Sequence, residues 1–190
     1  MFKDRIEVGR NLAQKLLPLK KGSDLVVAIP RGGIIVGYEI SRLLKLPLVP
    51  LVVKKVPTLG EPELAAGAVG PEGFSTGKKS RKIEKMVSER IERYDSQTDF
   101  EEKRIILTDD GVATGATIET AIFYLKEKKA ALITVAVPVV TKNEFERLGL
   151  LADRVVALTT PDEFTSIGEF YENFTQVTDE EVIQLLHRQK

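Results

Sequence analysis

The residues best suited to chemistry are two adjacent carboxylates, Asp109 and Asp110, which precede a loop of small residues. The apolar run at 105–107 predicts a buried strand before them, and the apolar spacing that begins at Ile118 is typical of one helix face. Backbone N–H groups of residues 114–117 would then lie at a helix start, where they favour an anion. Carboxylates accept hydrogen bonds from hydroxyl groups. The segment therefore predicts a sugar-phosphate site; the plainer alternative is two acids that only end a strand and cap a helix.

A second loop has related chemistry. Residues 30–33 read Pro-Arg-Gly-Gly and lie between a predicted strand at 25–29 and a predicted helix. In open α/β sheets, ligands bind at that edge. Gly32 and Gly33 would expose backbone N–H groups, and Arg31 offers a fork of donors to phosphate oxygens. Alone, this tetrapeptide fits a tight turn equally well. Together with the acid pair, it favours a second anion site.

The composition bounds the class of protein. The chain has 190 residues, enough for one domain with a sizeable core, and 43% of them are hydrophobic. It has no cysteine, which excludes disulfides and thiolate zinc sites, and its one histidine excludes a multi-histidine metal site. Lys and Arg number 28, as do Asp and Glu, which argues against nucleic acid or an anionic membrane as the main partner. With no signal peptide and no spanning apolar run, we expect a cytoplasmic protein.

Alternating strands and helices would position the two loops. Strands are predicted at 25–29, 48–53, 105–107, 131–139 and 154–158, and helices at 2–17, 34–44, 83–94, 118–125, 141–151 and from 178. Strands joined by helical crossovers imply a parallel sheet with helices on both faces. The first helix is predicted to bury one face, made up of Phe2, Ile6, Gly9, Ala13, Leu16 and Leu17. The sequence thus predicts a single α/β domain over residues 1–190.

The strand, the acid pair and the Thr-Gly-Ala-Thr loop resemble the signature of type I phosphoribosyltransferases. The resemblance implies that Asp109 and Asp110 hold the 2′- and 3′-hydroxyls of 5-phosphoribosyl-1-pyrophosphate (PRPP). The 5′-phosphate loop would be Ala113, Thr114, Gly115, Ala116 and Thr117. The pyrophosphate contacts would be Arg31, Gly32, Gly33, Lys54 and Lys55. The two lysines are equally well explained as a solvated strand end.

The resemblance extends over nearly the whole chain. Pro-Arg-Gly-Gly, Glu-x-Glu-Leu-Ala, Asp-Asp-Gly, Phe-Tyr-x-x-Phe and Thr-Asp-Glu-Glu-Val occur in that order, as in the uncharacterised predicted phosphoribosyltransferases of bacteria and archaea. It implies a flexible loop at about 57–79, a C-terminal hood at about 160–176, and a homodimer. Mg²⁺ would be carried by PRPP, near Asp109 and Asp110. Glu61, in the flexible loop, is either a functional acid or, more in keeping with base rates, a solvated one.

The acceptor is less well specified. In 6-oxopurine phosphoribosyltransferases an acid typically precedes the Thr-Gly pair and contacts the purine; Ala113 stands there in this chain, which disfavours such an acceptor. The hood is rich in aromatics, which suits stacking on a planar ring. Phe164 is the predicted contact, whereas Phe170 and Phe174 have the spacing of core residues. No residue stands out as a general base.

Three functions come into question. The resemblance favours a PRPP-dependent transferase that passes the phosphoribosyl group to a nitrogen acceptor, with PRPP and a small molecule as its partners. The alternative is a non-catalytic PRPP-binding regulatory protein. A dinucleotide-binding oxidoreductase is disfavoured, because no Gly-x-Gly-x-x-Gly follows any predicted strand.

Overall fold

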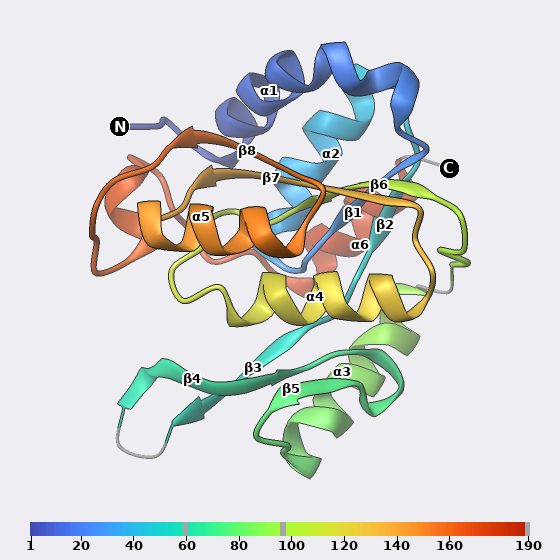
Figure 1. Ribbon diagram of the computed structural model, residues 1–190, viewed down its shortest axis with the longest axis vertical. Helices are drawn as coiled ribbons and strands as arrows, with labels where there is room; N and C mark the ends of the chain where they lie inside the picture. The colour runs from blue at the N-terminus through green and yellow to red at the C-terminus, as the bar shows by residue number, and fades with distance from the viewer. Residues whose placement is uncertain (59–60, 96–97, 189–190) are drawn as a thin grey trace.

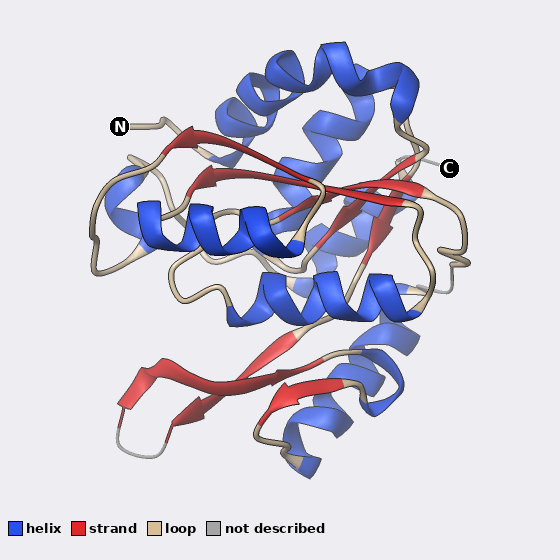
Figure 2. Ribbon diagram, in the orientation of Figure 1, coloured by secondary structure: helices blue, strands red, loops and turns tan. Residues whose placement is uncertain are grey.

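The structure, a computed structural model, describes residues 1–58, 61–95 and 98–188, and the side chains of all of these except 61–64. Strands and helices alternate along the chain except at 48–77, where four strands follow one another with no α-helix among the described residues (Figures 1 and 2). The strands are β1 (Leu25–Ala28), β2 (Leu48–Pro50), β3 (Lys54–Thr58), β4 (Glu61–Val69), β5 (Ser75–Gly77), β6 (Arg104–Thr108), β7 (Leu132–Val139) and β8 (Arg154–Thr159). The helices are α1 (Arg5–Leu16), α2 (Gly32–Leu44), α3 (Arg81–Tyr94), α4 (Ala116–Glu127), α5 (Lys142–Leu151) and α6 (Asp179–His187).

The main sheet has five parallel strands in the order β2-β1-β6-β7-β8. This confirms the predicted α/β class, in which helical crossovers join parallel strands. Pro50 ends the edge strand β2, where a missing N–H donor costs least. At the opposite edge, the Lys15 amine donates to the carbonyl of Ala157 on β8.

Alternate residues of the central strands point to opposite faces of the sheet, as a strand requires. Val26, Ile106 and Ala136 pack with α1 and α2. The residues between them pack with α4 and α5; they include Val27, Ile105, Leu107 and Val135. Both layers bury large apolar side chains completely, so the central strands are fixed on both faces.

The segment at 57–79 is not an open loop. Together with Lys54–Val56 it forms a separate antiparallel sheet in the order β3-β4-β5, with register shifts on both sides of Pro57. This sheet lies beside α3, away from the main sheet (Figure 1). β4 and β5 pair as a hairpin on either side of Phe74. Whether the sheet moves when ligand binds stays a prediction.

The first helix buries Gly9, Ala13 and Leu16 as predicted, but its buried face is turned away from the predicted one at other positions. Ile6 and Leu17 are exposed, at 40% and 54%, while Arg5 is buried, with 7% of its surface exposed. The helix is therefore rotated so that a charged residue points inward, and the reason lies in the site described below. None of the described helices is long and apolar enough to cross a membrane.

Candidate active site

The candidate site lies where the direction of the chain's connections reverses. From β1 the chain crosses to β2 on one side, whereas β6 lies on the other side and leads onward to β7 and β8. At such a switch point the loops after two neighbouring strands diverge and leave a crevice for a ligand. The loop at 29–33 leaves β1 and the loop at 109–115 leaves β6. The two strands stay paired to their ends, since Ile29 N–H donates to the Thr108 carbonyl at 3.0 Å.

The acid pair stands at the end of β6. Asp109 Oδ1 accepts the backbone N–H of Asp110 at 2.8 Å, which fixes the first carboxylate. Asp110 Oδ2 lies 2.7 Å from the Nε of Arg5. Burial raises the pKa of Asp109 well above its usual range; the negative charge of Asp110 raises it further, and the more distant Arg5 lowers it. The two carboxylates therefore sit in different environments, one neutralised by a cation and one largely dehydrated.

The glycine pair after β1 packs directly on the acid pair. A Cβ on Gly32 would lie 1.8 Å from Asp110 Oδ2, and a Cβ on Gly33 would lie 2.9 Å from the Cα of Asp109. Only glycine lets the two loops approach this closely. The Pro30–Arg31 peptide bond, just before the glycines, is cis. The two sequence motifs are thus the two walls of one site.

The small-residue loop turns into α4 at Gly115, which has φ +71°. That left-handed conformation favours glycine, and no side chain of the described residues caps the helix there. Its first N–H groups are therefore left to solvent or to a ligand, as an anion site requires. Ala113 and Thr114 are exposed before the turn.

A cavity of about 180 Å³ joins the acid pair to this loop. Most of the predicted site residues of this region line it, together with one residue of the C-terminal segment. The lining residues are Lys55, Asp109, Asp110, Gly111, Val112, Ala113, Thr114, Gly115, Thr117, Ile118 and Ile167. The structure therefore brings Lys55 to the same cavity as the carboxylates and the predicted 5′-phosphate loop.

Arg147 of α5 lies behind the small-residue loop at 113–117 and supports its conformation. Its guanidinium pairs with Glu144, at 2.7 Å, and with Glu119 of α4. It also lies 3.4 Å from the Thr114 carbonyl oxygen. A Cβ on Gly115 would come within 2.3 Å of the same guanidinium, so the loop passes directly over the charged group.

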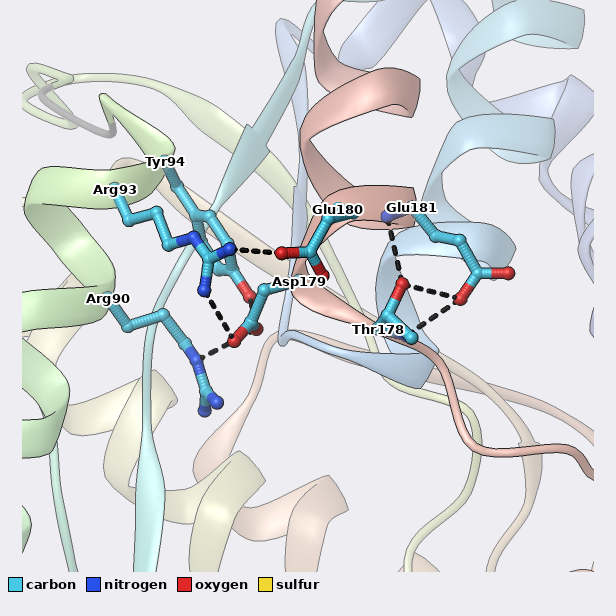
Figure 3. Close-up of polar contacts among 7 residues, drawn as sticks. All are labelled: Arg90, Arg93, Tyr94, Thr178, Asp179, Glu180 and Glu181. Atoms are coloured by element: carbon cyan, nitrogen blue, oxygen red, sulfur yellow. Dashed lines mark hydrogen bonds and ion pairs between the residues drawn. The ribbon is translucent and has the colours of Figure 1, made fainter.

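On the other side of the acid pair, positive charge gathers around Lys54. Burial lowers the pKa of the Lys54 ammonium, and the neighbouring cations Arg90 and Arg31 lower it further. Asp179, at the start of α6, is the counter-charge: it lies 3.2 Å from Arg90 Nε and 3.3 Å from Arg93 Nη1. Figure 3 shows these arginines of α3 directed toward it. The cations exceed the acids here, as an anion site needs.

Asp179 also connects α3, the helix beside the antiparallel sheet, to α6. It accepts the hydroxyl of Tyr94, so three side chains of α3 converge on the first residue of α6 (Figure 3). A capping box from Thr178 to Glu181 fixes the start of α6, where the sequence predicts a helix to begin. The basic region beside Arg31 thus depends on an element near the C-terminus.

The C-terminal segment adds one residue to the described cavity, and whether Phe164 contacts an acceptor stays a prediction. Ile167 is its residue in the cavity, while Phe164 packs edge-on against Phe170 with ring centroids 5.2 Å apart. Tyr171 is buried, and its hydroxyl donates to the Asp110 carbonyl at 2.7 Å. Phe174 is 37% exposed. The segment therefore reaches the site through Tyr171 and Ile167.

Two residues of this region were missed in the sequence, Arg5 and Arg90. Arg5 stands in a short charged stretch that reads as a solvated helix start, and its partner Asp110 is 105 positions away. Arg90 lies on the amphipathic helix α3, three residues after the buried Val87 and four before the buried Tyr94. For both arginines the partner that matters is brought in only by the fold, so the local sequence does not identify it.

Comparisons with known proteins agree with this geometry. The model of the phosphoribosyl transferase domain family matches residues 3–149. Two proteins of Mycobacterium tuberculosis, from strains CDC 1551 and H37Rv, bear the name "Putative phosphoribosyl transferase" and are 34% identical over 207 residues. The match covers 99% of this chain and 47% of each relative, so the chain spans about half their length.

Solved structures give the same fold. The protein TT1426 from Thermus thermophilus superposes with a TM-score of 0.85 at 34% identity, covering 98% of both chains. A purine phosphoribosyltransferase from Pyrococcus horikoshii superposes with a TM-score of 0.53 at 19% identity, covering 90% of both chains. At that identity the second match speaks for the fold alone.

Proposed function

The chain belongs to the phosphoribosyl transferase family, and from that premise we propose that it transfers the 5-phosphoribosyl group of PRPP to a nitrogen acceptor. In this reaction the bond from C1′ to the pyrophosphate oxygen breaks and a bond from C1′ to nitrogen forms. Pyrophosphate leaves with the bonding electrons, and the acceptor nitrogen loses its proton to solvent or to a base that the sequence does not identify.

One observation supports this proposal most strongly: a pair of carboxylates stands between the glycine loop at 30–33 and the small-residue loop at 113–117, at one edge of the sheet. PRPP has the complementary shape, because it is a ribose with a phosphate on one end and a pyrophosphate on the other. Asp109 and Asp110 would accept from the ribose hydroxyls, and residues 113–117 would hold the 5′-phosphate.

The leaving group would bind where the positive charge gathers. Arg31, the N–H groups of Gly32 and Gly33, and the lysines Lys54 and Lys55 would stabilise the charge that develops on pyrophosphate. The low pKa of Lys54 fits such a role, since burial and two nearby cations penalise its charge until an anion arrives. The carboxylates would keep negative charge near the sugar as it becomes cationic.

The donor set is suited to magnesium that arrives with the ligand. Within the described residues, no three His, Cys, Asp or Glu side chains gather as a metal cage. Mg²⁺ commonly keeps its waters and binds through one or two carboxylates and substrate phosphates. Asp109 and Asp110 are the residues that would contribute. When bound, the ion would neutralise charge on the pyrophosphate.

The acceptor we propose is a planar nitrogen heterocycle under the hood, with Phe164 as its contact. Ala113 offers no side-chain hydrogen bond, so recognition has to come from elsewhere. The Phe164 ring is only partly buried and touches Phe170 with its edge. Stacking on such a ring contributes about 1–3 kcal/mol per base. Phe164→Ala should then weaken acceptor binding and leave PRPP affinity unchanged; equal acceptor affinity in both proteins would refute the contact.

The test of the function is pyrophosphate release from PRPP and magnesium with a panel of free bases and small amines. The proposal expects at least one acceptor to give release together with a phosphoribosylated product, and the Asp109→Asn, Asp110→Asn protein to give neither. PRPP binding with no release from any acceptor would instead favour the regulatory alternative.

A further inference from the structure

Arg5 is the most deeply buried cation of the site. It lies at the start of α1 with 7% of its surface exposed. Nε lies 2.7 Å from Asp110 Oδ2, and Nη1 donates to the Thr175 carbonyl at 2.9 Å. One guanidinium thus joins the acid pair to the C-terminal segment, two parts of the chain that are distant in sequence.

Aromatic rings enclose the same guanidinium. Its Cζ lies 3.8 Å from the centre of the Phe174 ring and 5.9 Å from that of Tyr171, within the range of cation–π attraction. Tyr171 also donates its hydroxyl to the backbone carbonyl of Asp110. The carboxylate and the main chain of Asp110 are therefore both held by this group of residues.

The backbone fixes Arg5 in turn. Phe2 N–H donates to the Phe170 carbonyl at 2.7 Å, and the Phe2 carbonyl accepts from the N–H of Glu172 at 2.8 Å. Asn173 N–H donates to the Lys3 carbonyl at 3.0 Å. The chain start is thereby paired with the hood immediately before α1 begins. Removing one partner of such a buried, multiply bonded ion pair is strongly destabilising, because the other partner is left buried without its counter-charge.

We propose that Arg5 is a positioning residue for ribose recognition, which holds Asp110 in the one orientation that accepts a ribose hydroxyl. This inference rests on the proposed function. Asp110 has Gly32 directly against Oδ2, on the same side as Arg5, so its remaining oxygen is the one free to serve a ligand. Without Arg5 the carboxylate would have no fixed partner and would turn away. A lysine could restore the charge but not the bonds of the planar fork.

The experiment is a double-mutant cycle on PRPP affinity, measured by calorimetry with magnesium present. We expect Arg5→Gln to weaken PRPP binding at least tenfold, and Arg5→Lys to recover part of that loss. In the Asp110→Asn background, Arg5→Gln should change the affinity by less than twofold, because the group it acts through is gone. Arg10→Gln is the matched control: it removes the same charge from α1, at a residue that pairs with Glu39, and should leave PRPP affinity unchanged.

Two results would overturn the inference. One is wild-type affinity in Arg5→Gln. The other is an equal loss with and without the Asp110 carboxylate, since a merely structural arginine would weaken binding whatever stood at 110. If Arg5→Gln does not fold, the cycle is run with Arg5→Lys, and the same two results decide it. A wild-type protein that binds no PRPP would contradict the proposed function itself, before any variant is compared.

Discussion

Gly32 is the residue whose replacement the site should tolerate least. A Cβ there would lie 1.8 Å from Asp110 Oδ2 and 2.8 Å from Arg5 Nε, so Gly32→Ala must displace the ion pair or the loop. Forcing extra atoms into packed structure costs about 1–3 kcal/mol. We expect lower stability in chemical denaturation and at least tenfold weaker PRPP binding in calorimetry.

Gly149 provides the control for that substitution. It lies in α5 with nothing within 4 Å of an added Cβ. Gly149→Ala should raise stability by about 0.5–1 kcal/mol, because alanine loses less backbone entropy in a helix, and leave PRPP affinity alone. If both glycine variants behaved alike, close packing at Gly32 would not matter for the site.

We expect the charged carboxylate of Asp109, which the proposed function requires, to lower the stability of the folded protein. Its pKa is raised by burial and by the charge of Asp110, so the folded protein holds this proton more tightly than the unfolded chain does. The resulting destabilisation is absent below the unfolded pKa, near about 4, and grows as pH rises toward the folded pKa. Asp109→Asn should therefore raise the thermal midpoint at neutral pH and lose this advantage toward pH 4. A midpoint lowered at pH 7 would contradict this reading.

At the scale of elements, the ion pair of Asp24 and Arg104 fixes the register of the two central strands where they begin. Asp24 accepts from Arg104 Nη2 at 2.7 Å and from its backbone N–H at 2.8 Å. These bonds lower the pKa of Asp24 to about 2. Because the folded pKa is depressed, the stabilisation is complete above the unfolded pKa and disappears as pH falls through about 2.

Asp24→Asn should accordingly cost about 1 kcal/mol or less at pH 7, since side chains that are 32% and 43% exposed are partly screened by water. Urea denaturation from pH 7 down to pH 3 measures the difference between wild type and variant. We expect it to narrow below pH 4. If the difference in unfolding free energy between the two proteins stayed constant over that range, the ion pair of Asp24 and Arg104 would not be the cause of the lost stability.

The antiparallel sheet of β3, β4 and β5 is the element expected to respond to ligand. It is separate from the main sheet, and the register shifts around Pro57 weaken the pairing of β3 with β4. Amides at 65–79 should exchange hydrogen faster than those of β1 and β6 in the free protein, and slow down when PRPP and magnesium are added. Equal protection with and without ligand would remove the case for a closing lid.

The main sheet was predictable from the sequence because each of its signals is local. Apolar runs mark β1, β6 and β7, and helical spacing between them implies parallel crossovers. In open α/β sheets ligands bind at the carboxyl ends of the strands, and this rule predicts the position of both candidate anion-binding loops. By contrast, the pairing of Arg5 with Asp110 joins residues far apart in the chain, and no periodicity within α1 encodes such a partner.

At the scale of the whole molecule, segments near the beginning and toward the end of the chain support the site. The start pairs with residues 170–173, and α6 receives α3 through Asp179. The acid pair is therefore held by segments from the beginning, middle and end of the domain. This dependence on distant segments is why the sequence motifs alone predict the two candidate ligand loops but not the residues that support them.

The most direct test of the central claim is the thermal midpoint of the protein with PRPP and magnesium. A ligand that binds only the folded state stabilises it by about 2.7 kcal/mol at 100 times its dissociation constant. We predict a clear rise in the wild-type midpoint and none for Asp109→Asn combined with Asp110→Asn, which should remain folded. An unchanged wild-type midpoint, or an equal rise in the double variant, would contradict the claim that this carboxylate pair binds the ribose of PRPP.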